Sequence, residues 1–432
     1  MVALLTWRII LRGTPMSRSC FAASFLISCV LSGAEPTLAL KPGDRVALIG
    51  DSITAQKNYT RYVEIYLLTA SGVADLDVAQ FGWPGERASD WAGRWRTSTA
   101  WFKPNVVTTC YGMNDGAYRS FTPDIGDAYR QATTTYVTAM KSAGVRELVI
   151  GSPGVVDTTT FRNPTSPAVY NDNLGQLGLI GRGIAEEQHV RSADLHQPLL
   201  GAMTRAKAAY GADYPVAGGD GVHADENGHL VMAGALLQAL GCDGAIACIT
   251  FGADGTASAS AGHAVVHTAK HEVELASTRW PFVLMGDGKA PTSNRSIAPF
   301  TDFIERLDRF VVVMPSCTWA KATITWGSQS VTINGAQLKA GVNLMALFTI
   351  TPFDQANEDL WNKTFMQQEF ERHLVQEVVC QGNNQGVDAR PAATPEQQQV
   401  IAQAVAERTA KVAAVRAVLQ PLHHRIALAE AR

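Results

Sequence analysis

The sequence predicts an α/β fold in which helices cover both faces of a parallel sheet. Between residue 44 and about residue 240, short apolar runs rich in β-forming residues alternate with longer amphipathic stretches. Strands that alternate with helices form parallel sheets, because each crossover helix returns the chain to the same end of the sheet. Five strands are expected, at residues 46–49, 75–81, 106–111, 147–151 and 190–195.

The stretches between these runs predict the covering helices. Their apolar residues recur at helical spacing, and glycines close two of them. We expect helices over residues 59–70, 124–142, 168–188 and 226–240.

Changes in composition divide the 432-residue chain into four parts. Residues 41–243 carry the alternating pattern, and residues 244–380 predict a β-rich accessory domain that ends in a return helix over residues 356–379. Residues 381–432 predict a polar linker and a solvated helical tail from residue 394. Strands of the accessory domain are expected at residues 263–276, 310–314, 322–326 and 330–333.

Residues 1–40 have the pattern of a targeting segment. Met16-Ser-Arg18 precedes an apolar run over residues 20–31, and Ser32-Gly-Ala34 supplies small residues for cleavage. We therefore expect an exported protein. A lipoprotein anchor at Cys29 is the alternative, because Leu26-Ile-Ser-Cys29 resembles a lipoprotein cleavage box. No other stretch approaches the length of a membrane span.

The net charge and the cysteines bear on nucleic-acid binding and on disulfide formation. A net charge of −3 offers no electrostatic basis for binding nucleic acid. Five cysteines lie outside the leader, and Cys242 and Cys248 are close enough in sequence for a small disulfide loop. Two unpaired thiols fit that spacing equally well.

Residues that carry chemistry follow the predicted strands. Gly50-Asp51-Ser52 follows the first strand, Gly85 follows the second, and Asn114 follows the third. Asp220 and His223 come after the fifth strand, directly before the last predicted helix. Since open α/β sheets place their sites at the carboxyl ends of the strands, we expect these residues to meet at one sheet edge.

These residue types suit acyl transfer. A serine hydroxyl needs an adjacent base, and the His223 imidazole can accept a proton near neutral pH. Asp220 can orient that imidazole, as in a serine–histidine–aspartate triad. The amides of Ser52 and Gly85 and the Asn114 side chain can donate to the oxyanion of a tetrahedral intermediate.

Each of these residues also has a structural interpretation. Asp51 and Ser52 can cap a helix, Gly85 can serve a turn, and Asn114 can cap a helix. Asp220 can likewise cap the final helix and leave His223 on the surface. Their joint order at the strand ends favours the catalytic interpretation.

Together, Gly50-Asp51-Ser52, Gly85, Gly112-x-Asn114-Asp115 and Asp220-x-x-His223 resemble the four sequence blocks of the SGNH (GDSL-type) hydrolases. The resemblance covers residues 44–241 and implies a flavodoxin-like α/β/α fold and ester hydrolysis without a cofactor or metal. It also implies Ser52 as nucleophile, His223 as base, Asp220 as the orienting acid, and an oxyanion hole of Ser52, Gly85 and Asn114. Asp51 is then expected to hold the turn.

The expected substrate is a carboxylic ester, with carbohydrate O-acetyl esters favoured over long-chain lipids. The leader, the accessory domain and the tryptophans that follow the second block motivate this preference. A lipase- or lysophospholipase-type esterase of the same family is one alternative, and a catalytically silent carbohydrate-binding relative is another. Trp91 and Trp95 are spaced like residues that pack a helix into the core, so we expect them inside.

A metal site is a further alternative. His263, His267 and His271 recur every four residues, which places them on one face of a helix or of a strand. No cysteine joins them, and a solvated stripe of histidines is the expected outcome.

Overall fold

The computed structural model describes residues 37–431. The predicted targeting segment and Cys29 therefore lie outside the described residues, except for residues 37–40. In the part of the chain that is described, no helix is both long enough and apolar enough to cross a membrane.

A five-stranded, fully parallel sheet forms the centre of the first half of the chain, with strand order β2-β1-β3-β4-β5. This confirms the predicted sheet. The strands are β1 Arg45–Gly50, β2 Asp77–Gln80, β3 Val106–Cys110, β4 Glu147–Gly151 and β5 Arg191–Ala193.

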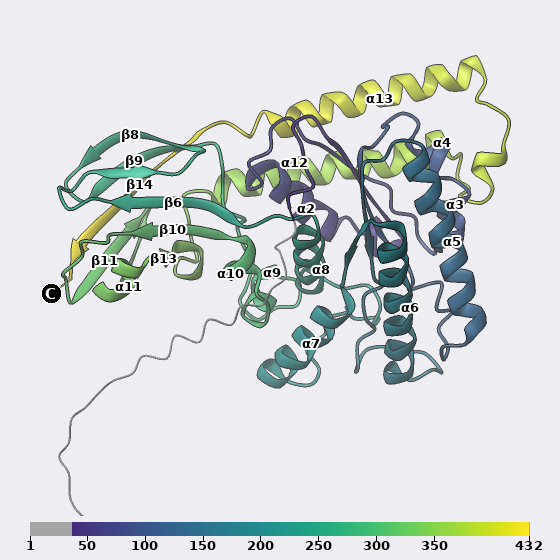
Figure 1. Cartoon of the computed structure of the whole chain (residues 1–432), viewed down its shortest axis with the longest axis horizontal. Helices are drawn as coiled ribbons and strands as arrows, with labels where there is room; N and C mark the ends of the chain where they lie inside the picture. The colour runs from purple at the N-terminus through teal and green to yellow at the C-terminus, as the bar shows by residue number, and fades with distance from the viewer. Residues whose placement is uncertain (1–36, 432) are drawn as a thin grey trace, which may run out of the picture. The chain divides into compact units, whose positions relative to one another are not determined.

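Residues of β1 show how the sheet is covered on both faces. Val46 and Leu48 pack into one hydrophobic cluster, whereas Ala47 and Ile49 pack into another, and all four are fully buried. Because side chains alternate across a strand, the two clusters lie on opposite faces. The three-layer α/β/α architecture is thus confirmed (Figure 1).

The predicted helices form close to their expected positions. One further helix, α7, lies in a stretch without a predicted element, and three short helices follow β1 and β2. The helices are α1 Ser52–Ala55, α2 Asn58–Thr69, α3 Ala88–Ala92, α4 Trp95–Thr99, α5 Pro123–Ser142, α6 Pro167–Gln188, α7 His196–Tyr210 and α8 Glu226–Ala239.

The second half of the chain contributes two further sheets, with strand orders β13-β10-β6-β7 and β12-β11-β14-β9-β8. Their strands are β6 Ala245–Phe251, β7 Ala257–Ala259, β8 His263–Ala269, β9 Glu272–Ser277, β10 Arg309–Val313, β11 Lys321–Trp326, β12 Gln329–Asn334, β13 Val342–Asn343 and β14 Leu422–Glu430. Short helices α9 Asn294–Ile297, α10 Phe303–Leu307 and α11 Gly335–Ala340 connect them.

The prediction of one strand over residues 263–276 is wrong. This stretch is an antiparallel hairpin of β8 and β9, and its turn contains His271 in the left-handed conformation, with φ +60°. The turn carries Lys270-His271 in place of the glycine or asparagine that usually marks such a position, so the sequence pattern did not indicate it.

A return helix was predicted over residues 356–379. The structure has α12 Asp354–His373, followed by a π-helical segment, Leu374–Val379. Helix α12 packs against α2 and β2 of the parallel-sheet region, as expected for a helix that returns to one of the two regions.

The C-terminal tail departs from the prediction in two ways. The helix forms only over α13 Pro395–Arg416, because residues 422–430 are strand β14, paired with β9 and β11. The tail is also firmly docked, although most of α13 is exposed: α13 runs along α12 (Figure 1), and Arg408 is buried in ion pairs with Asp77 and Glu371.

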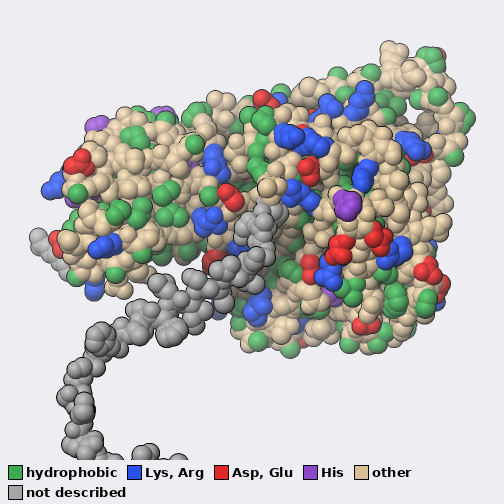
Figure 2. Space-filling model, in the orientation of Figure 1, with side chains coloured by type: hydrophobic (Ala, Val, Ile, Leu, Met, Phe, Trp, Pro, Cys, Tyr) green, Lys and Arg blue, Asp and Glu red, His purple; other side chains and the backbone are tan. Residues whose placement is uncertain are grey.

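Smaller expectations have clear outcomes. Trp91 and Trp95 are buried, as their spacing predicted. Cys242 and Cys248 are both free thiols, the first buried and the second exposed. Basic and acidic side chains occur over both the parallel-sheet region and the β-rich region in the view of Figure 2, in keeping with the small net charge.

Candidate active site

The candidate nucleophile is the first residue of α1, directly after β1. Asp51 caps this helix, because its Oδ1 accepts a hydrogen bond of 3.0 Å from the Ile53 amide. Only glycine fits at position 50, since a Cβ there would lie 2.1 Å from the Thr54 Oγ1 and 2.6 Å from the Cys110 carbonyl oxygen. The tight exit from β1 therefore places Ser52 at the carboxyl edge of the sheet.

Ser52, His223 and Asp220 form a continuous chain of hydrogen bonds. The Ser52 Oγ lies 2.7 Å from the His223 Nε2, and the His223 Nδ1 lies 2.6 Å from the Asp220 Oδ2. A carboxylate only accepts, so the Nδ1 carries the hydrogen and the Nε2 is free to accept from the serine. Of the residues predicted to meet at the sheet edge, these three are in direct contact.

The carboxylate of Asp220 is held ionised. Burial raises its pKa, but hydrogen bonds from the amides of His223 and Val222 and from the His223 side chain outweigh that effect. The pKa of Asp220 therefore lies below its ordinary value. A charged Asp220 can stabilise the imidazolium that forms when His223 takes a proton.

This chain is open to solvent. The side chain of His223 is 35% exposed and that of Asp220 is 57% exposed. A large molecule can therefore reach the histidine without any rearrangement of the core.

The two predicted oxyanion donors outside α1 lie on neighbouring loops that contact each other. The Asn114 Nδ2 donates a 3.0 Å hydrogen bond to the carbonyl of Glu86, the residue after Gly85. Gly85 adopts φ +73°, and the space where its Cβ would lie is empty to 4 Å. The Trp83 amide donates to the Gly50 carbonyl at 2.9 Å, which ties this loop to the strand that presents Ser52.

Two further acids lie close to the site without touching His223. Asp51 is 1% exposed, and burial raises its pKa to about 7. Asp115 accepts from the amides of Ala88 and Gly112, and burial raises its pKa to about 6. Their hydrogen bonds are to backbone amides, so both carboxyls hold loops in place.

A partly buried link between the end of α1 and the histidine loop was not predicted. The Gln56 Nε2 donates to the carbonyl of Ala224, the neighbour of His223, and the Gln56 Oε1 lies 3.1 Å from the His229 Nε2. Burial lowers the pKa of His229 to about 3, so this imidazole is neutral. The only sequence signal was a histidine six residues after His223, which on its own is common.

The three regularly spaced histidines do not converge. His263 is buried and hydrogen-bonded to Ser277 and to the Ile246 carbonyl, whereas His271 packs edge-on against Trp319 in a turn. Within residues 37–431, no group of three or more metal-ligating side chains is suitably arranged to hold an ion.

The comparison with known families supports a carboxylic ester hydrolase. Residues 48–231 match the model of the GDSL-like lipase/acylhydrolase family, so this part of the chain is similar to the SGNH (GDSL-type) hydrolases. The expected family resemblance is thus confirmed. A search of the curated proteins found no match.

Two solved structures are similar to this chain at low sequence identity. A gut microbial diltiazem-metabolizing enzyme is 19% identical with a TM-score of 0.72, over 92% of this chain and 100% of that chain. The acetylxylan esterase Axe2 from Geobacillus stearothermophilus is 21% identical with a TM-score of 0.40, over 47% of this chain and 97% of that chain. The first of these similarities extends the shared fold beyond the parallel-sheet region.

Proposed function

We propose that the protein hydrolyses carboxylic esters through an acyl-enzyme, with Ser52 as nucleophile, His223 as base and Asp220 as the orienting acid. The observation that carries this proposal is the chain of hydrogen bonds of 2.7 Å and 2.6 Å from Ser52 through His223 to Asp220. No cofactor or metal has a part in the proposed steps.

The first half of the reaction forms the acyl-enzyme. The Ser52 Oγ attacks the ester carbonyl carbon while the His223 Nε2 takes the hydroxyl proton. The oxyanion then accepts hydrogen bonds from the amides of Ser52 and Gly85 and from the Asn114 side chain. Asn114 has two amide hydrogens, so it can donate to the substrate while the other hydrogen stays on Glu86.

Collapse of this intermediate releases the alcohol. The His223 Nε2 returns its proton to the leaving oxygen, and the acyl group stays on the Ser52 Oγ. Water then enters, gives a proton to His223 and attacks the acyl carbon. A second collapse releases the carboxylic acid and returns the proton to Ser52.

Within the carboxylic esters, we favour carbohydrate O-acetyl esters as substrates. The exposure of His223 and Asp220 supports a bulky acceptor, because an open site admits a polymer chain that a deep tunnel excludes. The buried Trp91 and Trp95 add no support, since they cannot stack on a sugar. We also propose that the protein is exported, that residues 41–243 form a catalytic domain, and that residues 244–380 form an accessory domain whose five-stranded sheet is completed by β14 from the C-terminal tail.

Turnover of p-nitrophenyl acetate tests the mechanism. Ser52→Ala should lower kcat by about 10⁴-fold or more, because it removes the nucleophile. Ser142→Ala, at the exposed end of α5, is the matched control and should keep full activity. Retained activity in Ser52→Ala would overturn the mechanism.

Labelling and substrate length separate the alternatives. A catalytically silent binding relative would leave Ser52 unlabelled by an organophosphorus probe. A lipase-type enzyme would prefer p-nitrophenyl decanoate to the acetate, whereas the proposed enzyme should prefer the acetate and release acetate from acetylated xylan.

A further inference from the structure

The loop of residues 82–86 carries the candidate oxyanion donor Gly85, and it packs directly against the helix of the nucleophile. A Cβ at Gly82 would lie 2.4 Å from the Ala55 amide nitrogen and 2.7 Å from the Thr54 carbonyl carbon. Only glycine permits this close approach of the loop to α1. Any shift of the Gly82 peptide therefore changes the position of Gly85 relative to Ser52.

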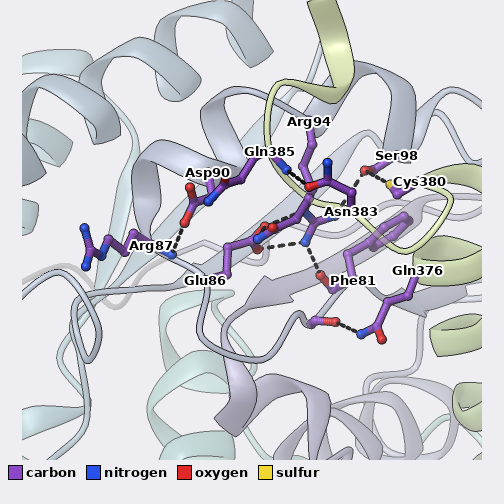
Figure 3. Close-up of polar contacts among 12 residues, drawn as sticks. Phe81, Glu86, Arg87, Asp90, Arg94, Ser98, Gln376, Cys380, Asn383 and Gln385 are labelled. Carbon is purple, nitrogen blue, oxygen red and sulfur yellow. Dashed lines mark hydrogen bonds and ion pairs between the residues drawn. The ribbon is translucent and has the colours of Figure 1, made fainter. Parts of the chain in front are cut away.

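Glu86 connects this loop to the core and to the other candidate donor. Its fully buried carboxylate accepts hydrogen bonds of 2.5 and 2.8 Å from Arg94 (Figure 3) and of 2.6 Å from the Tyr111 hydroxyl. Its carbonyl accepts from the Asn114 Nδ2. Glu86 thus lies between Gly85 and Asn114 and couples their positions.

The loop of residues 82–86 is also supported by residues 374–390, which lie far along the sequence. We call residues 374–390 the C-terminal clamp. The Gln376 Nε2 donates a 2.9 Å hydrogen bond to the Gly82 carbonyl, across 294 residues of sequence (Figure 3). Asn384 reaches the Glu86 Oε1 at 3.4 Å. The Cys380 Sγ lies 3.2 Å from the Ser98 Oγ, which accepts from Arg94.

The clamp is itself held firmly. Asp388 accepts hydrogen bonds of 2.8 Å from the Thr97 amide and 3.1 Å from the Arg96 amide, both in the first turn of α4, and its own amide donates to the Gly93 carbonyl. Arg390 donates to the carbonyls of Cys380 and Asn383. A loop fixed at both ends in this way can hold Gln376 in one place.

The π-helical segment that carries Gln376 fits the role of a fixed support for the Gly82 carbonyl. Gln376 is 7% exposed and lies in the π-helical segment that follows α12. Such turns insert an extra residue into a helix and are frequent at functional sites. Without Gln376, the Gly82 carbonyl would lose its side-chain donor in a buried setting.

We propose that the C-terminal clamp is part of the active site and that Gln376 is a positioning residue for the Gly85 amide. The inference rests on the proposed function. Oxyanion donors act at about 2.7–3.1 Å from the oxyanion, and a misplacement of 1 Å can cost about 100-fold in rate. Gln376 acts through the Gly82 peptide and does not touch the substrate.

The test variant removes the hydrogen-bond donor at position 376 and keeps a side chain of similar volume. Gln376→Met should lower kcat for p-nitrophenyl acetate by about 10- to 100-fold and change KM by less than about 2-fold, because the oxyanion exists only after attack. The inhibition constant of phenylboronic acid, which forms a tetrahedral adduct on serine, should rise by the same factor. Gln399→Met, on an exposed position of α13, is the matched control.

Amide hydrogen exchange of residues 82–86 supplies a readout that does not depend on activity. It should be faster in Gln376→Met than in the unaltered protein. Unchanged exchange would overturn the inference, and so would a lower melting temperature with unchanged kcat. If Gln376→Met does not fold, Asn384→Ala tests the same clamp, and equal kcat and equal exchange in that variant would overturn the proposal.

The two proposals fail in different ways. An unaltered protein whose turnover survives Ser52→Ala contradicts the proposed function, and the exchange experiment still decides the role of Gln376. Ser52-dependent turnover that is unaffected by Gln376→Met contradicts the clamp alone.

Discussion

Within residues 37–431, a serine hydroxyl lies at nearly the same distance from a histidine ring at the sheet edge and inside the β-rich region. The Ser52 Oγ lies 2.7 Å from His223, and the Ser277 Oγ lies 2.8 Å from both His263 and His424. Ser52 belongs to a cluster that is open to solvent, whereas Ser277 is fully buried. A short contact between serine and histidine is therefore not enough to define a nucleophile.

The hydrogens of the buried cluster can be assigned one by one. The His424 Nδ1 accepts from the Trp326 indole, so its Nε2 carries a hydrogen and donates to Ser277. The His263 Nε2 lies 2.9 Å from the Ile246 carbonyl and must donate to it, so the His263 Nδ1 accepts from Ser277. Each of these polar groups therefore has its hydrogen-bond partner inside the protein, and Ser277 is fully buried.

The first prediction, with the largest effect, concerns the acid that only the edge site possesses. Asp220→Asn should lower kcat/KM for p-nitrophenyl acetate by about 10²- to 10⁴-fold, because an amide cannot hold His223 in the useful tautomer or stabilise its charged form. Steady-state rates at pH 7 measure the effect. If kcat/KM fell by less than about 5-fold, the Ser52 cluster and the Ser277 cluster would differ only in their exposure to solvent.

The second prediction concerns the serine of the buried cluster. Ser277→Ala leaves a ring nitrogen of His263 and one of His424 without a partner, so the free energy of unfolding should fall by about 2–4 kcal/mol. Urea unfolding measures this change, with Ser258→Ala on the exposed face of β7 as control. The activity per folded molecule should not change, and a large loss of kcat would show that Ser277 has a catalytic part.

The third prediction uses pH. Burial lowers the pKa of His424 to about 3 from its ordinary 6.5. Between these values the unfolded chain binds a proton that the folded chain does not, so stability falls as the pH falls. His424 should contribute a loss of about 1.4 kcal/mol per pH unit between pH 6 and pH 4.

The variant His424→Asn separates the contribution of His424 to the pH dependence of stability from the contributions of other groups. Asp308 acts in the opposite direction, because burial raises its pKa to about 8. Urea midpoints at pH 6 and pH 4.5 should differ less in His424→Asn than in the unaltered protein. Equal differences in both proteins would show that His424 is already charged in the fold.

The edge site could be predicted because its parts are local. Each block is a few residues at the end of a strand, and the ends of parallel strands meet at one edge. Ser52 and His223 are therefore neighbours in space although 171 residues separate them in sequence. The parallel sheet and the helices on both of its faces followed from the same alternation of strand and helix, whereas the strand order was not predicted.

The supports of the site could not be predicted in this way. The Glu86–Arg94 ion pair is fully buried, and no periodicity indicates a buried charge pair. The bond from Gln376 to Gly82 joins residues whose pairing depends on the complete tertiary fold. Neither belongs to a pattern that recurs along the chain.

The missed strand β14 is a different case. Its side chains alternate, with His424, Ile426 and Leu428 buried between exposed neighbours. The alanine- and glutamate-rich composition nearby favoured helix, and a histidine does not usually indicate a core face. His424 can point inward because Trp326 and Ser277 satisfy both of its nitrogens.

The position of β14 has a consequence for biosynthesis. This strand is the middle one of its five-stranded sheet, although it is the last of the strands to be translated. Until residue 430 has left the ribosome, β9 and β11 each present an unpaired edge that another chain could bind. The five-stranded sheet therefore cannot be completed before β14 has been translated, and until then a chaperone that shields strand edges would help it most.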